Sequence, residues 1–289
     1  MRLPFAALLV TLIVVPGRAS GQVPAPAEAP LVLRFAAFTA VTGYERAVVD
    51  TLLTLLPGAT RDRGGSGVLV LGSGMPRRLV ACPLDEPGWI VGGVQPDGYL
   101  TLRRIGRAPS PLFDQQLEGQ RVTLFGRRGA VPGVVGVRSI HLARGRSGGA
   151  DEPFLTDDAR VDVGATSARQ VGELGLGVLT PVSLTKQPQW YGGELLAAPF
   201  AGRRAACAAL VLAARAATPG AGSVTVAFVT EHNLSDRGLQ TVRHTLGPFS
   251  DEWVVDLAVR HAGTPVETVS LRDVVLLRQR MEQWIRGTP

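Results

Sequence analysis

The 289-residue chain is poor in cysteine, and this limits the sites that it can build. Only Cys82 and Cys207 occur, and neither has the spacing of a metal ligand. The two residues can form one disulfide in an oxidising compartment, or they can remain two buried thiols, because free cysteine behaves as a small apolar residue. Of these two interpretations we favour the buried thiols.

Lysine is almost absent. Lys186 is the only one, and the other basic residues are arginines scattered along the chain. The net charge of +6 produces only a modest electrostatic field around a chain of this length. A protein that binds nucleic acid needs its basic residues clustered and interleaved with aromatic side chains, so the sequence argues against such a partner.

No apolar run is long enough to cross a bilayer, which takes about 20 residues. The longest candidate, residues 5–15, is shorter and is followed by the small residues Ala19-Ser20-Gly21. This pattern predicts a signal peptide over residues 1–21, and the proline- and alanine-rich residues 22–30 then read as a linker. We therefore expect a secreted or periplasmic protein with no membrane span once the signal is removed.

The sequence gives little sign of a serine or cysteine nucleophile. Its Gly-x-Ser-x-Gly match, residues 145–149, does not join a predicted strand to a predicted helix as a nucleophile turn does, and neither cysteine has an identifiable histidine partner. Catalysis through a covalent acyl intermediate is therefore disfavoured.

The first part of the chain carries helical periodicity followed by strand patterns. Residues 31–56 predict helices, with Thr42 as a cap and Glu45 completing a capping box. Residues 67–71 and 78–82 predict a β-hairpin. Short alternating strands then recur every 8 to 12 residues up to about residue 182, with one helix at residues 167–173, which is typical of a small β-barrel or sandwich.

Helical and buried-strand patterns return after this β-rich region. Residues 205–217 and 271–285 predict helices, and residues 223–229 and 253–259 predict buried strands. This alternation indicates an α/β domain into which the β-rich region is inserted.

Several short motifs follow one another in the order found in a known family. The chain resembles the glutamyl (tetrahedral) aminopeptidases, peptidases that use two zinc ions. The matching stretches are Thr42-Gly43-Tyr44-Glu45, Asp85-Glu86 with Gly88, Gly119-Gln120-Arg121-Val122, Asp162-Val163-Gly164-Ala165-Thr166-Ser167, and Pro265-Val266-Glu267 with Leu271-Arg272-Asp273-Val274.

The resemblance implies a three-layer α/β/α zinc-peptidase-like domain with an inserted small β-barrel domain. The α/β domain would comprise residues 31–86 and 187–289, with its C-terminal half shortened, and the insert would comprise residues 87–186. The family also implies a homo-oligomer.

Four positions at which the family carries a metal ligand hold residues that cannot bind metal. They are Pro83 in place of a histidine, Gly202 in place of the bridging aspartate, Asn233 in the Glu-Glu pair, and Gly263 in place of the last histidine. Proline and glycine offer no side-chain donor, and Arg203 places a cation beside the bridging position. Asp256 matches the remaining ligand, at the predicted end of a buried strand.

We therefore predict an exported, catalytically degenerate protein, a pseudoenzyme that acts as a peptide-binding or assembly module and needs no cofactor. A remnant cleft is expected beside Asp85, Glu231, His232 and Asp256. Asp85, Glu231 and His232 are the candidate catalytic residues, and Asp256 and His232 are the candidate metal ligands.

The alternative is an active aminopeptidase or other hydrolase with a rebuilt site for one zinc ion. His232, Asp256 and Asp85 would supply ligands, joined by Glu231 or His261. Three protein ligands and a water are enough for a catalytic zinc, provided that the side chains converge on one point.

Overall fold

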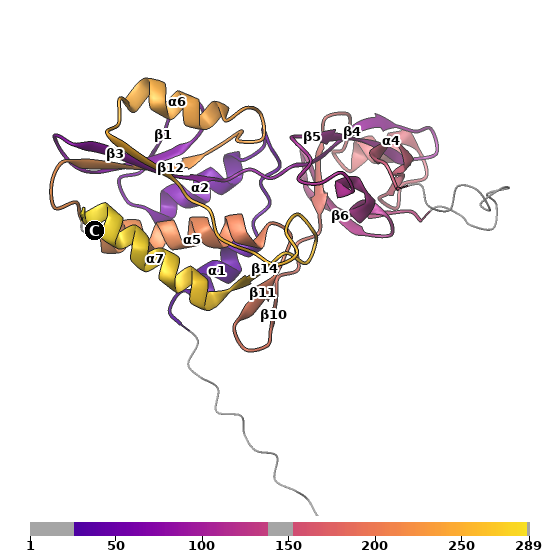
Figure 1. Cartoon of the computed structure of the whole chain (residues 1–289). Helices are drawn as coiled ribbons and strands as arrows, with labels where there is room; N and C mark the ends of the chain where they lie inside the picture. Colours follow the sequence, from indigo (N-terminus) through magenta and orange to yellow (C-terminus); the bar gives the residue numbers. More distant parts are fainter. Residues whose placement is uncertain (1–25, 138–152, 288–289) are drawn as a thin grey trace, which may run out of the picture.

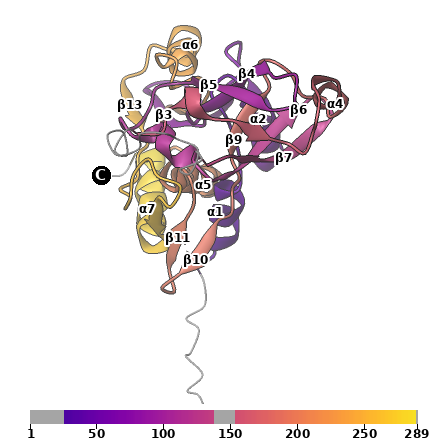
Figure 2. The same ribbon diagram turned by 90° about the vertical axis from the view of Figure 1, so that its right-hand side faces the viewer.

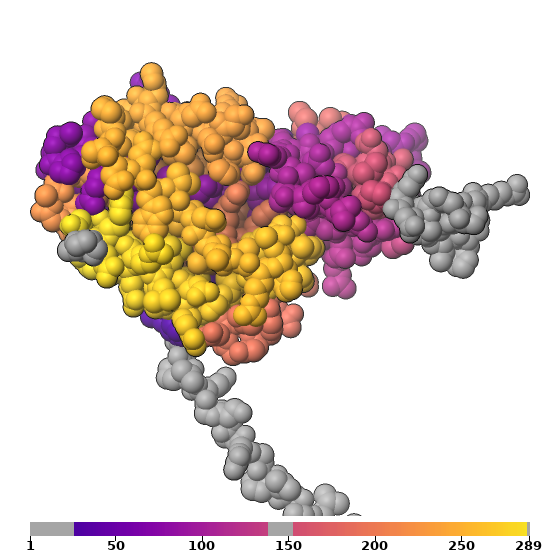
Figure 3. All heavy atoms as spheres, viewed as in Figure 1, coloured from indigo at the N-terminus to yellow at the C-terminus, as the bar shows by residue number. Residues whose placement is uncertain are grey.

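The computed structural model describes residues 26–137 and 153–287. They form an α/β domain and a β-barrel that projects from one side of it, as Figures 1 and 2 show from two directions. Figure 3 shows the same two parts as a surface, with the barrel beside the C-terminal half of the chain. The signal peptide predicted over residues 1–21 lies outside the described residues.

A five-stranded sheet forms the middle of the α/β domain, in the order β1-β2-β12-β3-β13. β12 lies parallel to β3 and antiparallel to β2, and β13 lies parallel to β3. The strands are β1 (Thr60–Arg61), β2 (Gly67–Gly72), β3 (Arg77–Pro83), β12 (Ser223–Val229) and β13 (Asp251–Val254).

The predicted hairpin of residues 67–71 and 78–82 is wrong, because β12 lies between β2 and β3. All seven residues of β12 are buried, so this strand needs a neighbour on each edge and a helical layer on each face. A pairing of this kind joins segments about 150 residues apart, and the local alternation on which the hairpin was based carries no information about it.

Helices cover both faces of the sheet and complete three layers (Figure 1). α6 packs on one face, where Leu239 and Val242 join sheet residues in a small core. The other face carries a larger core built from four helices. The helices are α1 (Ala29–Ala36), α2 (Arg46–Leu55), α5 (Ala201–Ala216), α6 (Arg237–Leu246) and α7 (Leu271–Arg286). The fold class predicted from the sequence, an α/β/α domain with a barrel, is confirmed.

The barrel is closed, with strand order β4-β5-β8-β7-β6-β9, and has its own apolar core. Ser167 caps the short helix α4 by accepting a hydrogen bond from the Gln170 amide. The strands are β4 (Gly88–Val94), β5 (Leu100–Ile105), β6 (Arg121–Gly126), β7 (Gly129–Val135), β8 (Val161–Asp162) and β9 (Pro181–Leu184), and the helices are α4 (Ala168–Glu173), η1 (Phe113–Leu117) and η2 (Thr156–Asp158).

A separate three-stranded sheet lies at the base of the α/β domain (Figure 1). Its strands are β10 (Gln189–Tyr191), β11 (Leu195–Ala197) and β14 (Thr268–Ser270), in that order. β11 and β14 come from distant parts of the chain, and their pairing brings the segment before α5 next to the segment before α7.

The structure corrects three local predictions. Cys82 and Cys207 form a disulfide, whereas we had favoured two free thiols. Thr42 does not cap α2: its hydroxyl donates to Asp85, and the Glu45 carboxylate accepts from backbone amides. Helix α1 begins at Ala29, inside the stretch predicted as a linker. No helix among the described residues is long and apolar enough to cross a membrane.

Candidate functional site

The candidate site lies where β3 and β12 end side by side. Pro83, the last residue of β3, is the register partner of Val229, the last residue of β12. In α/β sheets, ligands bind beyond the carboxyl ends of the parallel strands, where neighbouring chains leave the sheet together. The segments that follow, residues 84–86 and 230–233, carry most of the side chains predicted from the sequence.

Asp85 lies at the centre of this edge and is fully buried. Its Oδ1 accepts the amide of His232 at 2.9 Å, and its Oδ2 accepts the amide of Asn233 at 2.9 Å. The Asn233 side-chain Nδ2 and the Thr42 hydroxyl also donate to Oδ2, each at 2.8 Å. Four donors thus satisfy the carboxylate, which holds the loop after β12 in place.

Glu45 holds the same loop one residue earlier. Its Oε1 accepts the amide of Glu231 at 2.9 Å and the amide of Gly43 at 3.0 Å. Burial raises the pKa of Glu45 above its usual value, and the nearby Asp85 charge adds to this, while the two amides act in the opposite direction. Residues 231–233 are therefore fixed by two buried carboxyl groups.

The side chains of Glu231 and His232 interact within their own loop. Glu231 pairs with Arg237 at 3.3 Å, and Nδ1 of His232 contacts the Asp236 carboxylate. The structure thus brings Asp85 together with the backbone of His232 and Asn233. It uses these groups to hold the loop.

Two of the replaced ligand positions meet at one carboxylate. The amide of Gly202 donates to Oε1 of Glu267 at 2.9 Å, and the amide of Gly263 donates to Oε2 at 2.9 Å. Glu267 is buried and lies between β14 and the loop that carries Gly263. In the sequence Glu267 stands out only as part of a motif, because its partners belong to segments far from it along the chain.

The space at Gly202 is already occupied. A Cβ atom placed there would lie 2.3 Å from Cγ1 of Val259 and 3.3 Å from Oε1 of Glu267. An aspartate at this position would therefore clash with one neighbour and bring its charge close to another. Glycine is the residue that the present packing accepts.

Three buried charged groups lie beneath the site. Glu86 Oε2 accepts Nζ of Lys186 at 2.7 Å and a guanidinium nitrogen of Arg204 at 2.6 Å. At most 3% of any of the three side chains is exposed. Burial alone would raise the pKa of Glu86, but Arg204 and Lys186 together lower it, so the carboxyl is ionised. Burial lowers the pKa of Lys186 to about 8, against the opposing effect of Glu86.

Arg203 adds a further cation beside Gly202, the predicted bridging position. Its guanidinium donates to the backbone oxygen of Asp85. Burial lowers its pKa, and Asp85 is the largest opposing influence. The cation predicted beside Gly202 therefore contacts the loop that follows β3.

Asp256 differs from its predicted placement. Strand β13 ends at Val254, and Asp256 is an exposed residue beyond it whose Oδ1 accepts the amide of Leu257. His261 is also exposed. The prediction placed Asp256 at the end of a buried strand, whereas residues 255–259 form no strand and Asp256 is exposed.

The donor set does not fit a centre for two metal ions. Pro83, Gly202 and Gly263 offer no side-chain donor, and the oxygens of Asp85 are already engaged. Over residues 26–137 and 153–287, no three side chains of histidine, cysteine, aspartate or glutamate are grouped so that they could hold a metal. The rebuilt one-zinc site gains no support from this geometry.

Sequence comparisons match the chain to known aminopeptidases. The model of the M42 glutamyl aminopeptidase family matches residues 65–245. The aminopeptidase homologue SgcX of Escherichia coli K12 is 30% identical over 81% of this chain, and the lysyl aminopeptidase of Pyrococcus furiosus is 26% identical over 72% of it. The chain covers 62% and 60% of the lengths of these two relatives.

Solved structures share the fold. The aminopeptidase APDkam598 from Desulfurococcus kamchatkensis superposes with a TM-score of 0.80 at 16% identity, covering 90% of this chain and 95% of its own. The TET1 peptidase of Pyrococcus horikoshii, described as assembling into a tetrahedron or a large octahedral shell, superposes with a TM-score of 0.76 at 17% identity, covering 90% of this chain and 99% of its own.

These matches correct the expectation that the protein needs no cofactor. That expectation is wrong, because the family matched over residues 65–245 is metal-dependent, and the structure gives no positive sign of a cofactor-free protein. At the positions predicted from the sequence to be replaced ligands, Pro83, Gly202 and Gly263 offer no side-chain donor, and the side-chain amide of Asn233 is bonded to Asp85. On the family match, which spans more than half of its length, and on its 30% identity to SgcX, the chain belongs to the M42 glutamyl aminopeptidase family.

Proposed function

We propose that this protein is an exported peptide-binding module of the aminopeptidase fold that no longer hydrolyses its ligand at the family's site. The observation that carries the proposal is the Glu267 carboxylate, which joins the amides of Gly202 and Gly263. Two ions a few ångströms apart need an anionic bridge between them. Here the bridging position has no carboxylate of its own, and the nearest one is already bonded to the protein.

The disulfide supports the exported part of the proposal. Disulfides persist mainly in oxidising compartments such as the periplasm and the extracellular space. Cys82 and Cys207 are joined in this structure, and the apolar run of residues 5–15 followed by Ala19-Ser20-Gly21 has the form of a signal peptide. Fractionation of cells that express the full chain tests it, and a protein retained with its N-terminus intact in the cytoplasm would contradict it.

Turnover measurements test the loss of hydrolysis. The purified protein, reloaded with zinc, is assayed against a panel of aminoacyl p-nitroanilides and short peptides. We expect release of product no faster than in buffer, because the general-base position of the family's Glu-Glu pair is occupied by His232, which contacts Asp236. Zinc-dependent turnover that EDTA removes and fresh zinc restores would overturn the proposal.

We also propose that the protein forms homo-oligomers. The support is the assembly named for the TET1 peptidase, together with a second structural relative described as a dodecamer, which superposes with a TM-score of 0.73. Both relatives are under 20% identical to this chain, and light scattering on the full chain tests the proposal.

A further inference from the structure

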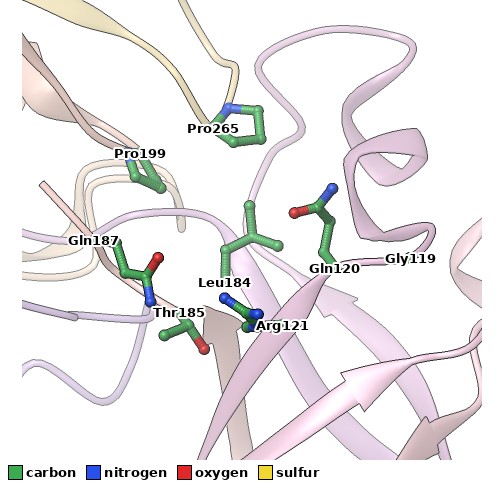
Figure 4. Close-up of a pocket in the computed structure, with 8 residues that line it drawn as sticks. All are labelled: Gly119, Gln120, Arg121, Leu184, Thr185, Gln187, Pro199 and Pro265. Atoms are coloured by element: carbon green, nitrogen blue, oxygen red, sulfur yellow. The ribbon is translucent and has the colours of Figure 1, made fainter. Parts of the chain in front are cut away.

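A polar pocket opens at the junction between the barrel and the α/β domain, and Figure 4 shows the residues that line it. Its volume is about 310 Å³. Ligand pockets range from about 300 to 1,000 Å³, so this one has room for a small molecule or for the end of a peptide.

The barrel contributes the polar groups of this pocket. Gln120 and Arg121 lie at the start of β6, and Thr185 and Gln187 follow β9. Arg121 is the only charged residue of the lining, and no acidic side chain lines it. Within the part of the chain that the structure describes, the side chains of Arg121, Gln120 and Gln187 form no hydrogen bond or ion pair, and all three residues are exposed.

The α/β domain contributes the apolar wall. Pro199 and Pro265 face the barrel residues in Figure 4, and Leu184 lies between them and Arg121. The backbone at Pro199 is fixed by a hydrogen bond, because Nζ of Lys186 donates to its carbonyl oxygen at 3.0 Å. A wall fixed in this way is formed before the ligand arrives, which lowers the cost of binding.

The pocket borders the position of the former metal ligands. Pro199 is three residues before Gly202, and Pro265 lies between Gly263 and Glu267. The Glu267 carboxylate accepts hydrogen bonds from the amides of Gly202 and Gly263, and so it joins the two segments that carry Pro199 and Pro265. A ligand in the pocket would therefore lie beside the place where a peptide meets the metal in a two-zinc aminopeptidase.

The charges of this region favour a ligand of negative charge. A free amino terminus needs an available carboxylate, but Asp85, Glu45, Glu86 and Glu267 are buried and bonded to donors of the protein. The guanidinium of Arg121 is available, and arginine binds carboxylates through two parallel hydrogen bonds. The side-chain amides of Gln120 and Gln187 can donate to the same ligand.

We propose that the pocket binds the carboxyl terminus of a peptide, with the terminal carboxylate on Arg121 and a small apolar terminal side chain against Pro199 and Pro265. This inference rests on the proposed peptide-binding function and specifies it further. The protein then recognises the opposite end of the chain from the end at which an aminopeptidase acts.

Three tripeptides that differ only at their ends test the inference by titration calorimetry. Acetyl-Ala-Ala-Leu has a free carboxylate, Ala-Ala-Leu-amide has a free amine, and acetyl-Ala-Ala-Leu-amide has neither. We expect the first to bind at least tenfold more tightly than the other two. If the peptide with the free amine binds as well as the first, the inference is overturned while peptide binding stands. If none of the three binds, the proposed function itself fails.

A matched pair of variants assigns the effect to the pocket. Arg121→Gln removes the cation of the lining, and Arg127→Gln removes an exposed arginine beyond the far end of the same strand, with the same change in net charge. We expect Arg121→Gln to weaken binding of the free carboxylate at least tenfold and to abolish its advantage over the amide, and Arg127→Gln to leave both unchanged. Discrimination that persists in Arg121→Gln would overturn the inference. Circular dichroism checks that both variants fold, as the exposed positions lead us to expect.

Discussion

Single residues decide what this site can still do. Pro83 and Gly202 have no side-chain donor. Pro83 is the partner of Val229 in the sheet, and Gly202 packs so closely against Val259 that a Cβ atom there would clash. The prediction that both positions are replaced metal ligands came from the motifs beside them in the sequence. The role of Glu267 could not be predicted in this way, because its two partners are backbone amides, and any residue other than proline supplies such an amide.

Glu86 is the residue whose loss should cost the most stability. Glu86→Gln leaves Lys186 and Arg204 buried without their shared counter-ion, and breaking a buried pair in this way destabilises by about 3–5 kcal/mol. Urea unfolding of the variant measures the loss. Glu173→Gln, which breaks an exposed pair with Arg169, is the control and should cost less than about 1 kcal/mol. Equal losses in the two variants would contradict this assignment.

Lys186 should make stability depend on alkaline pH. Burial lowers its pKa from 10.5 to about 8, so between these values the unfolded chain holds a proton that the native protein has released. Unfolding then takes up a proton, and the free energy of unfolding rises with pH across this window, by up to about 1.4 kcal/mol per pH unit. Below pH 8 both states are protonated and this contribution is constant.

The comparison with Lys186→Met isolates this effect. The variant keeps Arg204 as the partner of Glu86 and has no group that titrates at position 186. We expect the difference in unfolding free energy between wild type and variant to shift in favour of the wild type from pH 8 to pH 10. A difference that stays constant over that range would show that Lys186 does not titrate there.

At the scale of helices and strands, periodicity predicted most elements but not their partners. The limits of β12 match the predicted strand, and α4 (Ala168–Glu173) lies within the helix predicted over residues 167–173. The hairpin failed because β12 separates β2 from β3, and the buried strand expected through residue 259 ends at Val254. Both errors concern contacts between distant segments, which a local pattern of apolar residues does not encode.

The disulfide links two of these elements, β3 and α5, at the candidate site. It closes a loop of 125 residues, and both cysteines are buried. The double variant Cys82→Ala/Cys207→Ala should lose about 2–5 kcal/mol of unfolding free energy, because its unfolded chain is less restricted. Urea unfolding measures the loss. A reductant should lower the stability of the wild type toward that of the variant and leave the variant unchanged, and a reductant effect on the variant would point to another cause.

At the scale of the whole molecule, the barrel is where contacts between subunits are expected. Leu112 and Leu155 are 59% and 55% exposed, and they directly precede η1 and η2, two short helices that touch each other. Large apolar side chains gathered on a surface commonly mark an interface. The expected interface therefore lies on the insert, which also supplies Gln120 and Arg121 to the pocket.

Light scattering on the full chain and on Leu112→Glu/Leu155→Glu decides whether this surface assembles the protein. We expect the wild type to have a mass that is a multiple of 30.5 kDa, the mass of one chain. The variant should fall toward one chain, because glutamates in an apolar interface lose their hydration without gaining a partner. The single variant Leu276→Glu, at an exposed position on α7 of the α/β domain, is the control and should keep the wild-type mass. A wild type that stays near 30.5 kDa over a hundredfold range of concentration would contradict the proposed homo-oligomer and leave the pocket as the functional surface.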